Sequence, residues 1–382
     1  MKKYRPALIF LASTVVLAGA ILIISYFFSA NKNSSATDTA SEEQPRLFDE
    51  SVGNEDTLEN NSVTQVFLDN SLNQSRPLNL LFFGDMMLDR HVGERLEGRH
   101  MGYLLDGLAG EEKYFFTGFD IISANLEGAV TDGGAHYAPV NAYDFAFSPE
   151  RIAELKDYGF NYFALANNHF SDQGERGVIE TRKNLSELGF YFSGAPDARI
   201  DENTRQDIEV AGQKIAMISL SMVYNNFDLE NAKSLIEQAA IETDLTIINI
   251  HWGNEYQHQF NRYQQNVGHA LVEAGADMII GHHPHVVQGV EIYQGKPIFY
   301  SLGNFIFDQY FSAATQESLA LKITVDSEQI IISLLPLRSE RSVPRQMSDK
   351  EKEVFLKSFS AWSRTSETLV EEIENQRIII KR

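Results

Sequence analysis

Beyond Leu78 the chain alternates short apolar runs with amphipathic stretches, and this alternation limits the possible fold more than any other feature. The apolar runs are rich in β-branched and aromatic residues, which is typical of buried strands. The stretches between them repeat apolar residues at helical spacing. Alternating strands and helices predict an α/β fold with mostly parallel pairing. The predicted strands are Leu78–Phe83, Phe119–Ser123, Tyr162–Ala166, Lys214–Leu220, Leu245–Ile250, Met278–Ile280 and Ile298–Tyr300, and the predicted helices are Pro149–Tyr158, Gly174–Leu188, Leu229–Ala240 and Asn261–Ala274.

The last part of the chain has a different pattern. Leu319–Val325 and Gln329–Leu335 are apolar runs separated by a short polar turn, which predicts an antiparallel pair. After these runs the chain becomes more polar. We expect a surface helix at Lys350–Ser360 and an edge strand at Arg377–Ile380.

Polar clusters follow directly after five of the predicted strands. In open α/β sheets, ligands bind beyond the carboxyl ends of the strands, so these clusters should meet at one rim. The strand exits would deliver Asp85, Glu127, Asn168, His251, His283 and His285 to that rim.

The residue types in these clusters point to metal binding. Five of the ten histidines lie in them, and neutral imidazole is a common metal ligand. Mixed oxygen and nitrogen ligands suit Mn, Fe or Zn ions better than Ca²⁺, and the chain has no cysteine for a thiolate site. Six ligands exceed what one tetrahedral ion needs, which favours two neighbouring ions.

Each cluster also has a structural interpretation. Asp85 could cap a turn or a helix, and Glu127 could simply be exposed at the surface. The paired asparagines before His169 are common turn formers. His251 could be a satisfied core histidine. The repetition of polar clusters at five strand exits favours the metal site.

The amino terminus has the features of a membrane anchor. Lys2, Lys3 and Arg5 precede the mostly apolar run Ala7–Phe28, which is 22 residues long. At 1.5 Å per residue, this run can cross a hydrocarbon core of about 30 Å. The alternative is a cleaved secretory signal, whose apolar region is usually shorter, about 7–15 residues. The positive charges predict a cytoplasmic amino terminus and an outward-facing remainder.

These features predict a single-pass protein of the cell membrane with an extracellular carboxyl-terminal domain. A polar segment without periodicity is expected to form a disordered linker. The predicted parts are a cytoplasmic start (1–6), a transmembrane anchor (7–28), a linker (29–76), a metal-binding domain (77–336) and a carboxyl-terminal extension with a surface helix (337–382).

The formal net charge of −21 excludes one large class of partners. Nucleic-acid binding depends on a basic surface that attracts phosphates, and an acidic chain lacks one. We therefore expect no nucleic-acid partner.

A series of six motifs resembles that of the CapA-type, poly-γ-glutamate capsule biosynthesis proteins. Their order and approximate spacing agree from Leu78 to Asp308, roughly three-fifths of the chain. The predicted anchor and outward-facing layout are also typical of that family. The motifs are Gly84-Asp85-x-Met87-x-x-Arg90, Asn125-Leu126-Glu127, Ala166-Asn167-Asn168-His169-x-x-Asp172-x-Gly174, His251-Trp252-Gly253-x-Glu255, Gly281-His282-x-Pro284-His285 and Ser301-Leu302-Gly303-Asn304-Phe305-Ile306-Phe307-Asp308.

The resemblance extends to the calcineurin-like metallophosphoesterases and implies their fold, a sandwich of two mixed β-sheets flanked by helices. It implies that two divalent metal ions are bound. Glu127 stands where that superfamily has a bridging aspartate, and Met87 stands where its Asp-x-His motif has histidine. The implied metal ligands are Asp85, Glu127, Asn168, His251, His283 and His285.

The same resemblance implies roles in catalysis. His169 would be the general acid that protonates the leaving group. Arg90 and Asp172 are the other catalytic candidates, and Arg90 is expected to line the substrate pocket together with the Asn304 loop.

Two function classes follow from this resemblance. The first is a metal-dependent, phosphoesterase-like hydrolase or transferase that acts on a phosphoester or on a capsule polymer such as poly-γ-glutamate. The second is a non-catalytic component of capsule assembly or tethering with the same fold. Integral-membrane capsule synthesis or export proteins are the expected partners in both. The sequence leaves open the polymer, the metal identity and the oligomeric state.

Overall fold

The computed structural model describes residues 76–131, 143–223, 226–364 and 366–382. The predicted cytoplasmic start, the anchor and all of the linker but its last residue lie outside these ranges. Within the described ranges, no helix combines the length and the apolar character that crossing a membrane requires.

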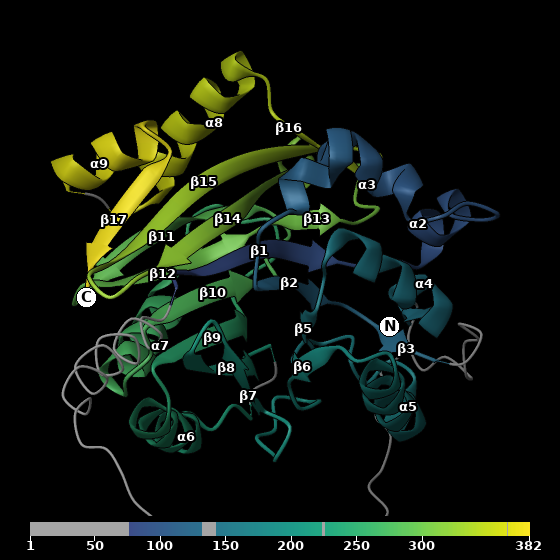
Figure 1. The fold of residues 1–382 in the computed structure, drawn as a ribbon, viewed down its shortest axis with the longest axis horizontal. Coiled ribbons are helices and arrows are strands. Elements are labelled where there is room, and N and C mark those ends of the chain that lie inside the picture. Colours follow the sequence, from purple (N-terminus) through teal and green to yellow (C-terminus); the bar gives the residue numbers. More distant parts are fainter. Residues whose placement is uncertain (1–75, 132–142, 224–225, 365) are drawn as a thin grey trace, which may run out of the picture. The chain divides into compact units, whose positions relative to one another are not determined.

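The fold is mixed α/β, as predicted, and contains two large sheets (Figure 1). The first, called the β1 sheet, runs in the order β16-β15-β14-β1-β2-β5-β6, with β13 paired to β1 and β17 paired to β15. Its members are β1 (Leu78–Met86), β2 (Ile121–Leu126), β5 (Tyr162–Ala164), β6 (Tyr191–Ser193), β13 (Asn304–Ile306), β14 (Glu317–Val325), β15 (Gln329–Glu340), β16 (Val343–Gln346) and β17 (Arg377–Lys381).

The second sheet, called the β9 sheet, runs in the order β11-β12-β10-β9-β8-β7. Its four central strands are parallel, and both edge strands pair antiparallel. A separate two-stranded ladder joins β3 (Ala129–Val130) and β4 (Ala146–Phe147). The members of the β9 sheet are β7 (Arg205–Val210), β8 (Gln213–Ser221), β9 (Leu245–His251), β10 (Met278–His282), β11 (Val287–Tyr293) and β12 (Lys296–Leu302).

The two sheets share one apolar core. Phe82 of β1, Ile247 of β9 and Ile280 of β10 are fully buried members of the same cluster. The residues on either side of Phe82 in β1, Leu81 and Phe83, belong instead to the core on the other face of the β1 sheet. This alternation follows from the two-residue period of a strand and buries both faces of the sheet.

Helices cover the outer face of each sheet (Figure 1). On the β1 sheet these are α3 (Gly102–Ala109), α4 (Pro149–Ala153) and α5 (Gly174–Glu187), with the 3₁₀ turns η1 (Glu111–Phe116) and η3 (Glu154–Tyr158). On the β9 sheet they are α6 (Leu229–Glu242) and α7 (Arg262–Glu273). The remaining helical elements are α2 (Arg90–Arg95), η4 (Ala314–Gln316), α8 (Asp349–Trp362) and α9 (Glu367–Glu374).

Side-chain caps explain where several helices begin. Ser148, Asp228 and Ser348 each accept a hydrogen bond from a backbone N–H in the first turn of the helix that follows. Asn261 forms a reciprocal capping box with Gln264 at the start of α7. These caps satisfy donors that have no partner inside the helix.

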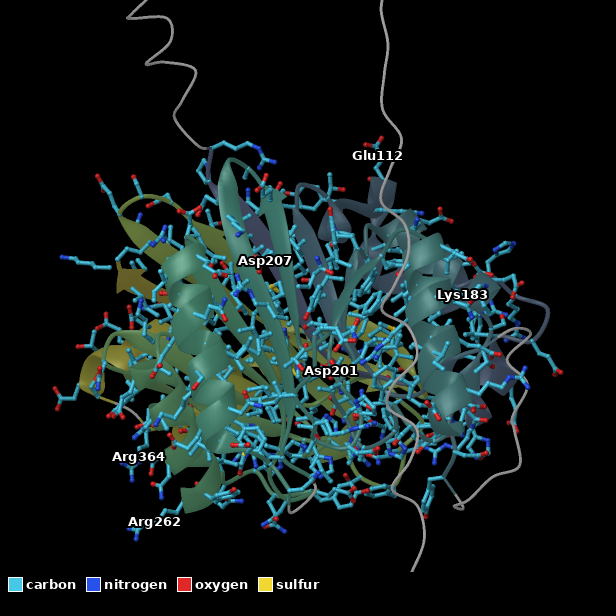
Figure 2. The ribbon with its side chains drawn as sticks, turned by 90° about the horizontal axis from the view of Figure 1, so that it is seen from below. Glu112, Lys183, Asp201, Asp207, Arg262 and Arg364 are labelled. Atoms are coloured by element: carbon cyan, nitrogen blue, oxygen red, sulfur yellow. The ribbon has the colours of Figure 1, made fainter. Side chains whose placement is uncertain are left out.

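Charged side chains lie at the outside of these layers (Figure 2). Glu112, Lys183 and Arg262 are labelled at the periphery of the ribbon, and all three are exposed. The charges at such positions, acidic and basic, are therefore solvated. The few charged groups that are buried need a separate explanation.

Most predicted elements are confirmed. All seven predicted strands of the α/β part and the later antiparallel pair β14–β15 are present. The predicted helix at Pro149–Tyr158 divides into α4 and η3. The sequence pattern did not reveal α2, α3, α9, β3, β4, β6, β7, β11, β13 or β16.

The carboxyl-terminal segment contributes to the β1 sheet. The predicted boundary between residues 336 and 337 falls inside β15, a continuous strand. β17 then pairs antiparallel with β15, and α8 and α9 contribute Phe359 and Ile373 to the core between the sheets. Residues 337–382 therefore take part in the same fold unit as the strands before them.

Candidate metal centre

Backbone register brings three polar residues side by side at one end of the β1 sheet. Asp85 lies opposite Asn304 of β13 and opposite Asn125 of β2. In the β9 sheet, His282 of β10 lies opposite His251 of β9. All five side chains are almost completely buried. The carboxyl ends of strands from both sheets therefore converge on one buried polar centre.

A bulge in β1 directs Asp85 into this centre. Phe82 pairs with Ser123 and Asp85 pairs with Asn125, so β1 has one extra residue between the two pairs. In a regular strand of the same sequence, without the bulge, alternation would place Asp85 on the outer face with Phe83. Gly84 lies in the bulge, and a Cβ atom there would be 1.8 Å from the backbone oxygen of Gly303. The close approach of the two backbones thus requires glycine.

The side-chain amide of Asn125 joins the acidic groups. Its Nδ2 donates to Asp85 Oδ1 at 2.8 Å and to Glu127 Oε1 at 3.1 Å. The same nitrogen lies 3.3 Å from Nδ1 of His251. Asn125 therefore holds two carboxylates and an imidazole close together without itself being charged.

Two sets of side chains have the composition and spacing of metal-ligand groups. One is Asp85, Glu127 and His251, and the other is Glu255, His283 and His285; within each set the ligand atoms lie within 4.8 Å of one another. The sets are adjacent, because the ring centroids of His251 and His283 are 4.6 Å apart. Five of the six predicted ligands thus fall into these groups.

Buried atoms without hydrogen bonds support the fit of a cation. Oε2 of Glu127, Nδ1 of His283 and Nε2 of His282 are buried and have no hydrogen-bond partner among the described residues. A buried polar group without a partner is costly, so each such group calls for an explanation. Carboxylate and imidazole donors without sulfur suit Mn, Fe or Zn. The donor set therefore fits divalent cations, whose number and identity stay predictions.

The carboxylates interact strongly with the neighbouring histidines. Burial and the nearby charge of Asp85 raise the pKa of Glu127 well above its usual range. Burial opposes ionisation of Asp85 as well, but His282 and His285 outweigh it and hold the pKa of Asp85 well below its usual range. Two fully buried carboxylates so close together require positive charge nearby.

The histidines divide into two kinds. Burial lowers the pKa of His251 well below the usual range and lowers the pKa of His283 to about 3, with neighbouring histidines adding to the effect. Both are therefore neutral, which is the form that binds metal. Burial also opposes protonation of His285, but Glu127 and Asp85 outweigh it and raise its pKa to about 9.

The run Asn167-Asn168-His169 gives each of its side chains a separate contact. Asn167 donates to the backbone oxygen of Leu126 at 2.9 Å and accepts the N–H of His169 at 3.0 Å, which ties the ends of two strands together. Oδ1 of Asn168 lies 2.8 Å from Nε2 of His251. Asn168 thus reaches the ligand group as predicted, while Asn167 is structural.

His169 and Asp172 form a hydrogen-bonded pair beside the metal centre. Nδ1 of His169 lies 2.8 Å from Oδ2 of Asp172, and the same oxygen accepts the backbone N–H of Phe145 at 2.9 Å. The ring of His169 also contacts the ring of Phe145, with 4.2 Å between centroids. A carboxylate at Nδ1 leaves Nε2 as the nitrogen available for proton transfer.

An open cavity of about 430 Å³ adjoins the centre. Arg90 lies on its wall, where its guanidinium is ion-paired with Asp308 and sits 4.6 Å from the ring centre of Phe145. The predicted Arg90 is therefore at the cavity, although an acidic partner already offsets its charge. The cavity is lined by Arg90, His91, Tyr143, Phe145, Asn168, His169, Glu255, Tyr256, His285, Phe307, Asp308, Gln309 and Phe311.

Four residues at or beside this cavity have backbone in the left-handed region. Arg90, Tyr256, His283 and His285 have φ values of +49°, +61°, +97° and +57°. Residues other than glycine rarely adopt positive φ values. Those that do often lie at functional sites, where the surrounding structure holds them in this conformation. Four of the thirteen such residues in the described part of the chain thus lie at or beside the predicted site.

Three residues of the centre were absent from the predicted ligands. Glu255 lies in the loop after β9 and is exposed, and His282 ends β10 with its Nδ1 3.4 Å from Oδ1 of Asp85. Asn125 links the two carboxylates. All three belong to the quoted motifs, so the signal was present, but spacing alone could not show that Glu255 turns back toward His283.

Comparisons with known proteins agree with these motifs. Residues 79–309 match the family described as bacterial capsule synthesis protein PGA_cap. The chain is 27% identical over 294 residues to the capsule biosynthesis protein CapA of Bacillus anthracis, covering 72% of this chain and 71% of that protein. It is 29% identical over 256 residues to the PGA biosynthesis protein CapA of Bacillus subtilis, covering 63% and 66%.

Two solved structures show a weaker similarity. A hypothetical protein from Thermus thermophilus aligns with a TM-score of 0.42 at 14% identity, over 71% of this chain and 96% of that one. A phosphatase from Mycoplasma pneumoniae aligns with a TM-score of 0.41 at 14% identity, over 72% and 92%.

Proposed function

The chain belongs to the bacterial capsule synthesis protein family, and we propose that it acts in the biosynthesis or export of a capsule polymer of the poly-γ-glutamate type. The match, residues 79–309, contains all six sequence motifs. Two relatives named for capsule or PGA biosynthesis support the same role. The partners of this role are the polymer and integral-membrane proteins of capsule synthesis or export.

The proposal includes a position at the membrane. The apolar run of residues 7–28, preceded by basic residues, supports a single-pass anchor with a cytoplasmic amino terminus. The folded domain would then lie outside the cell, where a capsule polymer is assembled. Protease treatment of intact cells tests this layout, because an outward-facing domain is digested and a cytoplasmic domain is protected.

The proposed activity is metal-dependent hydrolysis or transfer, as in the metallophosphoesterases. The observation that carries it is the pair of buried carboxylates, Asp85 and Glu127, beside imidazoles with unpartnered nitrogens. Two divalent cations bound there would polarise the substrate and lower the pKa of an attacking water. The substrate is a phosphoester or an amide of a poly-γ-glutamate chain.

Protein side chains would supply the remaining chemistry. Asp172 holds Nδ1 of His169, so that Nε2 is available to give a proton to the leaving group. Phe145 fixes the dyad from the other side through its backbone N–H and its ring. Asn168 orients His251 through Nε2 or binds a cation in its place.

Replacing His169 by Ala tests the catalytic role. We expect kcat of the full-length, Mn²⁺-loaded protein on phosphoesters or poly-γ-glutamate to fall by roughly 10²–10⁴-fold. Metal content, measured by elemental analysis, should not change. His100, whose side chain is 91% exposed outside the cavity, provides the control His100→Ala. If the wild-type protein binds no metal and turns over neither substrate, the proposed enzymatic activity is refuted.

One observation favours a non-catalytic alternative. Met87 occupies the position of a superfamily metal ligand, is fully buried in the core outside the centre, and accepts a contact from the N–H of Asp89. One of the two implied metal sites would therefore lack a histidine ligand that the superfamily usually has. If cells with His169→Ala make normal capsule while cells without the protein make none, the assembly role is correct.

A further inference from the structure

We infer that Tyr256 and Phe311 form an aromatic rim that binds the substrate unit next to the reacting group. This inference rests on the proposed function and specifies the substrate as an extended chain. Both residues line the cavity beside the metal centre. Neither belongs to the predicted site.

The rim presents ring surface to solvent. Phe311 is 67% exposed and Tyr256 is 42% exposed. The two rings meet edge to face, with 5.2 Å between centroids and 83° between planes. Large aromatic side chains at the mouth of a cavity offer apolar area that a ligand can cover.

The rim is continuous with the metal centre. The ring of Tyr256 lies 6.1 Å from the ring of His285 at an interplanar angle of 28°. Tyr256 directly follows Glu255, a member of the same ligand group as His285. If the reacting group of a substrate were bound at the cations, the substrate atoms next to that group would therefore contact the ring of Tyr256.

The backbone holds Tyr256 in an unfavourable conformation. Its φ is +61°, and its N–H donates to the oxygen of Pro284 at 2.8 Å. A bulky residue in this region costs free energy that the surrounding structure must offset. The hydrogen bond to Pro284 holds this conformation with Tyr256 at the cavity, and packing of the core does not explain it because the residue is exposed.

Hydrogen bonds connect the rim to a metal-ligand candidate. Gln309 donates from Nε2 to the hydroxyl of Tyr256 at 3.2 Å, and its Oε1 accepts from Asn304 at 3.1 Å. Asn304 Oδ1 in turn lies 2.9 Å from Nδ1 of His285. Gln309 is thus a positioning residue that couples the orientation of the Tyr256 ring to the metal centre.

The chemistry of the rim selects an extended chain with apolar segments. Cations held by the ligand groups would bind the oxyanion of the reacting group, and the uncharged rings would contact the atoms beside it. A γ-linked glutamate chain has methylene groups between its carboxylates, so it can place those groups on the rings. In a chain of net charge −21, an uncharged rim binds such a polymer without adding local repulsion.

Calorimetric titration tests the rim. The full-length, Mn²⁺-loaded protein would be titrated with a γ-linked glutamate hexamer and with free glutamate. We expect Phe311→Ala to lower the affinity for the hexamer by roughly 3- to 10-fold, which is the range expected for the loss of one aromatic contact. The affinity for free glutamate should not change. Gln309→Leu should produce the same difference with unchanged Mn²⁺ content. Tyr263→Ala is the matched control, because Tyr263 is 61% exposed and lies outside the cavity lining.

The outcomes separate the rim from the proposed catalysis. If both variants bind the hexamer as the wild type does, or if the wild type prefers the hexamer no more than free glutamate, the rim is refuted even when the enzyme is active. If the wild type hydrolyses nothing but Phe311→Ala still loses hexamer affinity, the rim is supported and the catalytic role fails.

Discussion

Replacing Glu127 by Gln should change stability in opposite directions with and without metal. The substitution keeps the size of the side chain and removes one of two fully buried carboxylates. Oε1 of Glu127 accepts from Asn125 at 3.1 Å, and Oε2 has no hydrogen-bond partner among the described residues. The unpartnered oxygen is the atom expected to bind a cation.

The magnitude with metal follows from linkage. At a free Mn²⁺ concentration of 100 times Kd, binding raises the free energy of unfolding by about 2.7 kcal/mol. If loss of the carboxylate raises Kd roughly twentyfold, the same Mn²⁺ concentration contributes only about 1 kcal/mol. The variant should therefore lose most of the stabilisation that Mn²⁺ gives the wild type.

Without metal the sign reverses. The carboxylates of Asp85 and Glu127 repel each other in a site shielded from water, and an amide removes that repulsion. Relief of one poorly satisfied buried charge is worth roughly 1–3 kcal/mol. In excess EDTA, the variant should be at least as stable as the wild type and up to that much more stable.

Urea denaturation of the full-length chain, in EDTA and in Mn²⁺, measures both effects. Glu209→Gln is the control, because Glu209 is exposed on β7 and away from the centre. If Glu127→Gln gains as much stability from Mn²⁺ as the wild type, Glu127 is not a ligand. If the metal-free variant is the less stable of the two, the repulsion between the carboxylates has been assigned wrongly.

Three further substitutions test other parts of the structure. Asp172→Asn should lower kcat roughly 10- to 100-fold at unchanged Mn²⁺ content, since it removes the carboxylate that orients His169; an unchanged kcat would contradict this. Gly84→Ala should weaken Mn²⁺ binding and thermal stability, because the new Cβ would lie 1.8 Å from a backbone oxygen, whereas Gly107→Ala meets nothing within 4 Å and should be tolerated. Phe83→Ala should cost about 3–5 kcal/mol of unfolding free energy in urea, as it removes a buried ring, and a loss below 1 kcal/mol would be inconsistent with tight packing there.

Strand positions were predictable because burial determines composition. β9 is buried at every residue, and its sequence before His251 is apolar except for Thr246 and Asn249. β7 was missed because most of its residues are only partly buried or exposed, so its sequence resembles a loop. The predicted strand Gln329–Leu335 ended before β15 does, because the alternation of buried residues in its first half breaks at Pro336 and Leu337, which are both buried.

The sequence predicted most of the residues of the metal centre, but it did not predict how their side chains are arranged. A polar residue after an apolar strand marks a strand exit, which is why Asp85 and His251 were found. Simple alternation along β1 places Asp85 on the wrong face, because the bulge at Gly84 is not visible in the pattern. Glu255 and Asn125 could be recognised only once their contacts with the other ligands were known.

The pairing of β13, β1 and β2 fixes the positions of Asn304, Asp85 and Asn125 relative to one another. The distances between these three residues therefore depend little on the loops that connect the strands. Insertions between η1 and β2, which lie away from the ligand residues, could change the surface and leave the buried groups where they are. Inserting a single residue into β1 beside Gly84 would instead move the aspartate out of register with Asn125 and Asn304. Divergence among related proteins should accumulate in the former places and be rejected in the latter.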